Sequence, residues 1–200
     1  MCNEKLNPQV YEVINTTSWL VDIPVSITLW TRPALQKEQF EVLRLARPST
    51  LFLISDGGRN ANEANLIAES RAVFNDIDWC CTVHKLFWDS NQGMYSTSRQ
   101  SAEYMWSVAD RMILLEDDII PSVSYFRFCK EMLDKYENDL RVLGVCGMNH
   151  EGVTERTESD YFFSREASIW GMAIWRRTYE NRNFNYSANE YAQRTITECA

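Results

Sequence analysis

The most informative stretch of this chain is RMILLEDDIIPS, from Arg111 to Ser122. An apolar run ends there in three consecutive carboxylates, Glu116-Asp117-Asp118, and apolar residues resume directly after them. Adjacent carboxylates repel one another, so clustering them does not by itself stabilise a fold. A solvated acidic turn is one interpretation of such a triplet. The apolar flanks favour another, in which the carboxylates end a buried strand and serve a ligand.

Composition and charge limit the classes of protein that this chain can belong to. Its 200 residues are 45% hydrophobic and 12% aromatic, which indicates one globular domain with a sizeable core. The formal charge of −8 disfavours nonspecific binding of nucleic acid, which needs clustered Lys and Arg. A phosphate can still bind if a few arginines or a bridging cation are placed locally.

Neither a membrane segment nor a disulfide pattern is visible. The apolar runs fall short of the roughly 20 residues that a membrane-spanning helix needs, and the N-terminal MCNEKLNPQVYE lacks the apolar core of a signal peptide. Zinc-like spacing is absent from the six cysteines, which are Cys2, Cys80, Cys81, Cys129, Cys146 and Cys199. Free thiols in a reducing compartment are favoured over disulfides, so we expect a soluble cytoplasmic protein.

The pattern along the chain predicts the fold class. Residues 1–21 have weak periodicity and are expected to form a leader, followed by a single domain over residues 22–200. Apolar, strand-like runs then alternate with helical patterns. Strands are expected at 24–30, 51–54, 81–88, 112–115 and 141–146, and helices at 34–44, 60–74, 98–108 and 122–136. This alternation predicts an α/β fold with a mostly parallel central sheet flanked by helices.

Polar residues and glycines follow every one of the expected strands. They are Thr31-Arg32, Asp56-Gly57-Gly58, Asn91-Gln92-Gly93, Glu116-Asp117-Asp118 and Met148-Asn149. In open α/β sheets, ligands bind at the carboxyl ends of the strands. The convergence of these strand ends therefore predicts a binding site more firmly than any single motif does.

The acidic triplet suits a metal and a phosphate. Side-chain alternation at the end of a strand would place Glu116 and Asp118 on the same side. A divalent cation would relieve their repulsion and recruit phosphate oxygens, which favours Mg²⁺ or Mn²⁺. One carboxylate on the metal and another on a ribose hydroxyl would give a nucleotide site within an acidic protein.

A receiver domain of a bacterial response regulator is a rival interpretation, because ILLEDD also resembles the first strand of that domain. Such a domain needs a phospho-accepting Asp at a later strand end and then a Lys. Asp160 lies at a tolerable distance, but Lys135 is the last lysine of the chain. The β/α units upstream of the triplet would also have no counterpart, so the receiver is disfavoured.

A more specific resemblance comes from an ordered set of motifs. PVSITLWTRP, LFLISDGG, SNQGMYSTSRQSAEYMW, RMILLEDDIIPS, GMNH and SREASIWGMAIWRRTYE follow one another along the chain. Together they resemble nucleotide-sugar glycosyltransferases of the A-type fold. They are most similar to bacterial sugar transferases related to the N-acetylglucosaminyltransferase I group, which carry Glu-Asp-Asp as their Asp-x-Asp motif. The resemblance spans roughly Ile23 to Tyr179 and implies a Rossmann-like A-type fold.

The resemblance implies roles for the donor-binding residues. Asp118 would coordinate Mn²⁺ or Mg²⁺ that bridges the donor diphosphate. Glu116 and Asp117 would contact the ribose and the donor sugar or organise water around the metal. Arg32 would reach the nucleotide, in keeping with its suitability as a phosphate partner. Asp56 would accept a hydrogen bond from the base.

Other motif positions are implied to lie around the same donor and acceptor. Asn91 and Gly93 would open the loop over the nucleotide, and Arg99 would neutralise phosphate. Trp170 and Gly171 would line the sugar pocket, where an indole face suits the C–H surface of a sugar ring. A place in the core is an equal alternative for Trp170 and the favoured one for Trp175. The acceptor-binding candidates are Asn149 and His150, and for His150 a structural role at the strand end is the favoured interpretation.

The implied activity is that of a metal-dependent glycosyltransferase of the hexosyltransferase type. It would move a sugar from a nucleoside-diphosphate donor, UDP-linked by expectation, to a hydroxyl of a glycan or similar acceptor. The catalytic base is unassigned, with Asp160, Glu166, Glu180 and Glu190 as candidates. Members of the group usually continue beyond the point equivalent to Ala200, which implies a short or C-terminally incomplete form.

Two further functions are compatible with the same motifs. One is that of a truncated or inactive member that binds nucleotide sugar without turnover. The other is that of a sugar-1-phosphate nucleotidyltransferase, which needs a glycine-rich loop after the first strand. TRPALQK lacks those glycines, so the nucleotidyltransferase is disfavoured.

Overall fold

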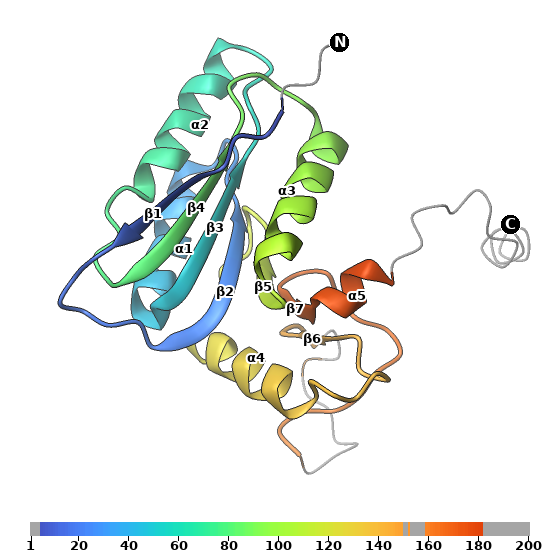
Figure 1. The fold of residues 1–200 in the computed structure, drawn as a ribbon. Coiled ribbons are helices and arrows are strands. Elements are labelled where there is room, and N and C mark those ends of the chain that lie inside the picture. Colours follow the sequence, from blue (N-terminus) through green and yellow to red (C-terminus); the bar gives the residue numbers. More distant parts are fainter. Residues whose placement is uncertain (1–4, 150–151, 153–158, 182–200) are drawn as a thin grey trace, which may run out of the picture.

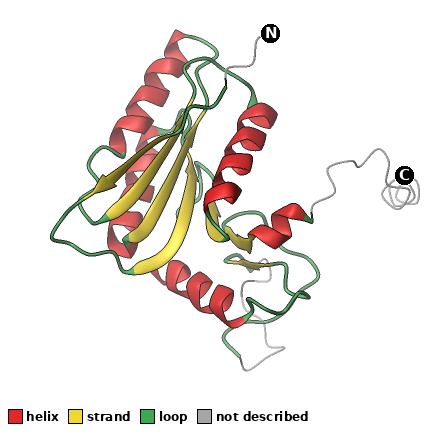
Figure 2. Ribbon diagram, in the orientation of Figure 1, coloured by secondary structure: helices red, strands yellow, loops and turns green. Residues whose placement is uncertain are grey.

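A computed structural model describes residues 5–149, 152 and 159–181, and these form an α/β fold (Figures 1 and 2). The elements in chain order are β1 (Gln9–Val13), β2 (Val21–Thr28), α1 (Pro33–Ala46), β3 (Pro48–Ser55), α2 (Ala61–Val73), β4 (Cys81–Phe87), α3 (Met94–Val108), β5 (Arg111–Leu115), α4 (Val123–Lys135), β6 (Gly144–Cys146), β7 (Met172–Trp175) and α5 (Arg176–Glu180). None of the helices in the described part of the chain is long and apolar enough to cross a membrane. The described cysteines, Cys80, Cys81, Cys129 and Cys146, are free thiols, as expected.

The sheet has seven strands in the order β1-β4-β3-β2-β5-β7-β6 and is mixed. Its central strands β4, β3, β2 and β5 are parallel, which confirms the predicted centre of the sheet. The pairings β1–β4, β5–β7 and β6–β7 are antiparallel, so the expectation of a mostly parallel sheet fails toward both edges. Within the segment expected to be a leader, Gln9–Val13 form β1 and pair with β4, so this part belongs to the sheet.

The central strands are apolar on both faces because helices cover both. Alternate residues of β2, among them Ile23 and Ile27, face a core shared with α1 and α4. Phe52 of β3 faces the opposite side, where it joins Trp106 of α3 in a second core. Figure 1 shows α3 on the other side of the sheet from α1 and α2. A sheet buried on both faces explains the continuous apolar runs of its strands.

The sheet topology brings the carboxyl ends of β2, β3, β4, β5 and β6 to the same end of the sheet. We call this end the carboxyl-end edge, as distinct from the outer strands β1 and β6. Since β7 is antiparallel to both β5 and β6, β6 runs in the same direction as β5. The amino end of β7 lies at the same edge, which brings Gly171 and Trp170 there as well. The predicted convergence of polar strand ends is therefore confirmed. The strand pattern did not place Trp170 and Gly171 at this edge, for which only the family resemblance gave an expectation.

Local sequence sets the helix ends around this edge. Pro33 occupies the first turn of α1, where its missing N–H costs nothing. Asn60 caps α2 by accepting a hydrogen bond from the Glu63 N–H. Ser122 precedes α4 as expected but makes no capping hydrogen bond, since its hydroxyl pairs with that of Ser124. Helix α3 begins at Met94 rather than at the expected Ser98.

Candidate functional site

The acidic triplet forms a turn directly after β5, and two buried glutamines of α1 hold its backbone. Gln39 Nε2 donates to the carbonyl oxygens of Glu116 at 3.0 Å and Ile119 at 2.8 Å. Gln36 Nε2 donates to the carbonyl oxygen of Asp117 at 3.2 Å. Both side chains are almost fully buried, at 0% and 1% exposed for Gln36 and Gln39. The turn is thus fixed by its main chain, which leaves the carboxylates available for other partners.

Arg32 lies beside the triplet, as the strand-end pattern predicts. Its Nη1 is 2.9 Å from Asp118 Oδ2 and 3.3 Å from Asp117 Oδ1. The Arg32 side chain is 46% exposed and that of Asp118 is 51% exposed, so both can reach an incoming ligand. A half-exposed pair of this kind contributes little to stability, about 0–1 kcal/mol. One arginine therefore faces two of the three carboxylates in a solvent-accessible site.

The charges of the triplet are not fully compensated. Partial burial raises the pKa of Asp117, the Arg32 guanidinium lowers it, and Asp118 raises it again. Desolvation also raises the pKa of Glu116, and the neighbouring Asp118 and Asp117 add to that rise. Asp117 Oδ2 is buried and has no hydrogen-bond partner among the described residues. A buried acceptor without a donor is costly, so this carboxylate would gain from a cation or a donor supplied by a ligand.

The carboxylates fit one particular kind of metal site. Nowhere in residues 5–149, 152 and 159–181 do three His, Cys, Asp or Glu side chains come together to hold an ion. Mg²⁺, however, is commonly held by one or two carboxylates together with substrate phosphates and water. Asp118 and Asp117, with the orphaned Oδ2 of Asp117, match that mode. The residues suit an ion that binds with phosphate rather than a metal held in a cage of protein ligands.

A pocket of about 530 Å³ adjoins the end of the triplet. Its lining residues are Asp118, Ile119, Ile120, Pro121, Ser122, Tyr125, Gly147, Met148, Trp170 and Gly171. This volume lies in the range of small-molecule sites. Trp170 is 54% exposed at this pocket, whereas Trp175 is 4% exposed in the core, as expected. The pocket is lined by the segments that follow β5 and β6 and the segment that precedes β7, so residues distant in sequence form one site.

Gly147 is required where it stands in this pocket. A β-carbon added to it would lie 2.4 Å from the Tyr125 ring, so no larger residue fits without displacing that ring. Its N–H donates to the Gly171 carbonyl at 3.2 Å, which ties the two glycine-containing segments together. Gly171 has a φ of 67°, a left-handed conformation that favours glycine.

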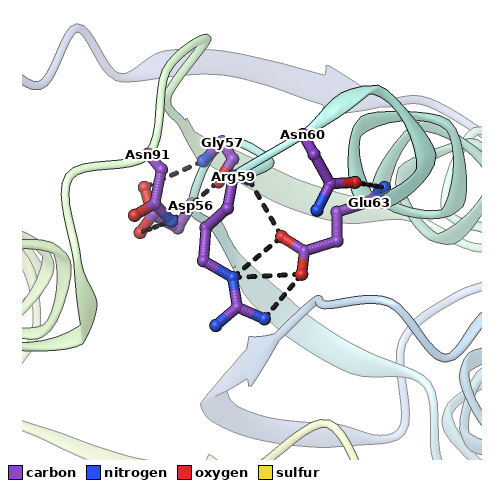
Figure 3. A network of polar contacts seen from close by, with 6 residues as sticks. All are labelled: Asp56, Gly57, Arg59, Asn60, Glu63 and Asn91. Carbon is purple, nitrogen blue, oxygen red and sulfur yellow. Dashed lines mark hydrogen bonds and ion pairs between the residues drawn. The ribbon is translucent and has the colours of Figure 1, made fainter.

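Asp56 also lies at this edge of the sheet, and its carboxylate is fully engaged. Figure 3 shows its contacts with Gly57 and Asn91. Oδ1 accepts from the Gly57 and Gln92 N–H groups, both at 2.8 Å. Oδ2 accepts from the Gly93 N–H at 2.9 Å and from Asn91 Nδ2 at 3.0 Å. These four bonds match the acceptor capacity of a carboxylate. Asp56 therefore fixes the loop after β4, while its predicted contact with a base stays a prediction.

Two arginines that sequence reasoning missed stand beside the Asp56 loop. Arg59 pairs with Glu63, as Figure 3 shows, and its guanidinium lies 5.9 Å from the centre of the Trp30 ring. Arg71 donates to the carbonyl oxygens of Ser55, Asp56 and Trp88. Arg71 thereby ties together the carboxyl ends of β3 and β4.

Some predicted site residues have other partners. Arg99 is 80% exposed on α3 and pairs with Glu103, its neighbour one turn away. Asn149 Nδ2 donates to the Gly152 carbonyl at 3.1 Å. His150 and Glu190 lie outside the described residues. The other base candidates, Asp160, Glu166 and Glu180, are exposed, and none of them lines the pocket.

The glutamines of α1 are functional candidates that carried a usable signal in the sequence. Gln36 and Gln39 are in phase with Phe40 and Leu43 on the buried face of the helix. Residues three and four apart share a helix face, so polar side chains at these positions must find buried partners. Glutamines on that face predict buried side-chain hydrogen bonds, but the sequence does not identify the groups that accept them.

Comparison with known proteins adds no family. No protein-family model matches the chain, and no curated protein matches it. The resemblance to nucleotide-sugar glycosyltransferases therefore stays a prediction that depends on the motifs.

Proposed function

We propose that this protein is a metal-dependent glycosyltransferase whose donor is a nucleoside-diphosphate sugar, with UDP as the expected nucleotide. The observation that carries the proposal is the carboxylate turn beside Arg32, open to a pocket lined by Asp118 and Trp170. Cationic and anionic groups side by side suit a phosphate with its metal ion, and an indole beside them suits a sugar ring. The proposed fold within the α/β class is the A-type glycosyltransferase fold.

Each of these residues would contact a different part of the donor. Arg32 would leave its carboxylate partners to bind the diphosphate, since a guanidinium can form two parallel hydrogen bonds to phosphate oxygens. Asp118 and Asp117 would hold Mn²⁺ or Mg²⁺ against the same diphosphate. When bound, such an ion would stabilise the negative charge of the leaving nucleoside diphosphate. Glu116 would contact the ribose, and Trp170 with Gly171 would take the sugar.

Binding without turnover is a second candidate function, and one observation favours it. The pocket has Asp118 as its only lining carboxylate in the described chain, and the proposal gives Asp118 to the metal. An inverting transfer needs a base that deprotonates the acceptor hydroxyl. Without such a base the protein would retain the nucleotide sugar unchanged, so binding and transfer must be measured separately.

The sheet topology disfavours a receiver domain, and the loop after β2 disfavours a nucleotidyltransferase. A receiver domain has strand order 2-1-3-4-5, whereas this sheet pairs its triplet-bearing strand β5 antiparallel to β7. A nucleotidyltransferase would need a glycine-rich loop after the first parallel strand. Here residues 29–32, which contain no glycine, connect β2 to Pro33 at the start of α1.

Calorimetric titration with nucleoside diphosphates, with and without Mn²⁺, tests the donor site. We expect one diphosphate to bind in a metal-dependent manner, and Asp118→Ala to weaken that binding by about a hundredfold or more. Absence of binding by folded wild-type protein, with or without metal, would overturn the proposal. The Arg127→Ala variant, which removes an exposed ion pair on α4, serves as the matched control and should bind as wild type does.

Turnover is tested by following release of the nucleoside diphosphate from the donor that binds. Release that depends on an added hydroxyl acceptor supports transfer. Tight binding with neither transfer nor hydrolysis would favour the binding-only candidate.

A further inference from the structure

We propose that Gln36 and Gln39 are positioning residues of the donor site, which set the affinity for nucleoside diphosphate and metal by holding the carboxylate turn at a fixed distance from Arg32. This inference goes beyond the motif residues and rests on the proposed function. Neither glutamine lies within the motifs that carry the family resemblance. Their assignment depends on where their amide groups lie.

The hydrogen bonds of the two glutamines converge on the turn. Together they donate to the carbonyl oxygens of Glu116, Asp117 and Ile119, across the whole triplet and the residue after it. Gln36 Nε2 also donates to Gln39 Oε1 at 3.2 Å, which links the two amides. Such a buried side-chain network fixes the geometry of the groups that it joins.

The same helix carries the counter-charge. Arg32 immediately precedes α1, Gln36 lies one turn into it, and Gln39 lies about one further turn along. The carbonyl of Arg32 accepts the Gln36 N–H at 3.0 Å, so the arginine backbone belongs to the first helical turn. Helix α1 therefore sets the positions of both Arg32 and the carboxylate turn. A ligand that needs both charges at a set separation benefits from this arrangement.

Stability of the fold alone would not require glutamines at these two positions. The face they occupy is otherwise apolar, and Phe40 and Leu43 continue it into the core. Apolar residues there would pack against the sheet and leave the turn to find other partners. The buried amides instead keep three carbonyl oxygens directed into the protein, while the carboxylates of Asp117 and Asp118 face Arg32.

The experiment compares Gln36→Met and Gln39→Met with Arg177→Met. Arg177 Nη2 likewise donates to three main-chain carbonyls, those of Tyr136, Asp139 and Val142, in a turn away from the triplet. All three variants should lower the melting temperature. We expect the glutamine variants to weaken metal-dependent UDP binding by about tenfold or more, and Arg177→Met to change it by less than about twofold.

A pH series with Gln39→Glu separates positioning from loss of stability. The new carboxyl would face the main-chain carbonyl oxygens of Glu116 and Ile119 and the side-chain amide of Gln36. The charged groups of the same turn are the carboxylates of Glu116, Asp117 and Asp118, with Arg32 paired to the last two. When ionised, the new carboxyl cannot donate to the turn, and when protonated it can donate one hydrogen bond. The affinity relative to wild type should therefore recover as the pH falls in Gln39→Glu and stay constant in Gln39→Met, which has no titrating group at this position.

The outcomes separate the inference from the proposed function. Glutamine variants that bind UDP with metal as tightly as wild type, or that lose no more affinity than Arg177→Met, would overturn the inference and leave the donor site standing. A relative affinity of Gln39→Glu that does not change with pH would also count against it. Wild-type protein that binds no nucleotide would overturn the proposed function and this inference with it.

Discussion

Two acidic loops at one edge of the sheet have opposite hydrogen-bonding environments. The Asp56 carboxylate accepts four hydrogen bonds, three of them from main-chain N–H groups. The triplet after β5 has its main chain held instead, and one carboxylate oxygen of Asp117 is buried without a partner among the described residues. In the sequence both are acidic residues at a strand end. The comparison indicates that a satisfied carboxylate supports the fold, whereas an unsatisfied one is available to a ligand.

The largest expected effect separates the two loops by stability. Asp56→Ala would leave the N–H groups of Gly57, Gln92 and Gly93 without their acceptor, so the free energy of unfolding should fall by about 3 kcal/mol. Asp118→Ala should stay within about 1 kcal/mol of wild type, because its exposed ion pair contributes little. Urea denaturation measures both. Equal losses in the two variants would break the comparison.

A smaller effect is expected for the partner of Asp56 in the neighbouring loop. Asn91 Nδ2 donates to Asp56 Oδ2 and to the Gly57 carbonyl at 2.9 Å. Asn91→Ala should cost about 1 kcal/mol of stability, since water can replace part of these exposed contacts. The affinity of Asn91→Ala for UDP sharpens the comparison. If Asn91 contacts the nucleotide, the folded variant should bind UDP more weakly than wild type does, and if it only supports the loop, the affinity should stay close to that of wild type. Thermal unfolding and calorimetry on the same samples provide both values.

The charge of Glu116 should slightly destabilise the fold at neutral pH. Its pKa is raised in the folded protein by desolvation and by repulsion from Asp118 and Asp117. A raised pKa means that the folded state favours the protonated form, so the contribution of Glu116 to stability is highest at low pH and falls as the pH rises through that pKa. Glu116→Gln should therefore be more stable than wild type at neutral pH, and the gap should close on acidification. Urea denaturation across a pH series measures the gap, and one that widens in acid would contradict this sign.

The smallest effect is expected at Arg99. Its guanidinium is exposed and pairs only with Glu103 on the same helix among the described residues. Arg99→Ala should change the free energy of unfolding by no more than about 0.5 kcal/mol, as is usual for such helix pairs. A matching constancy of UDP affinity would remove Arg99 from the donor site. An affinity loss of about tenfold would restore the role that the family resemblance implies.

Much of the fold could be predicted because its signals are local. The apolar runs of β2, β3, β4 and β5 follow from burial on both faces, and Asn60 marked the start of α2 correctly. The strands that escaped prediction lie toward the edges. Residues of β1 are mostly exposed and show no alternation of apolar and polar side chains. Strand β7 is only four residues long, too short for a clear periodicity, and lies in a motif whose aromatic and basic residues suggest chemistry rather than a strand.

The candidate site was predicted in part, for a related reason. Arg32, Glu116, Asp117 and Asp118 stand at strand ends, and parallel strands bring their carboxyl ends to one edge whatever the details of packing. Trp170 and Gly171 joined them only because β7 runs antiparallel between β5 and β6. That pairing is a long-range contact without a local signal.

Residue order alone was enough to establish the α/β class, the parallel centre of the sheet and the clustering of charges at one edge, since periodicity and strand-end chemistry act over a few residues. Which acidic loop is satisfied emerged only from the folded chain. In the folded chain, hydrogen bonds between segments engage the Asp56 carboxylate and connect Gln36 and Gln39 to the triplet, while an oxygen of Asp117 stays unpaired among the described residues. Such pairing depends on distances between elements far apart in the chain, and residue order does not encode those distances locally.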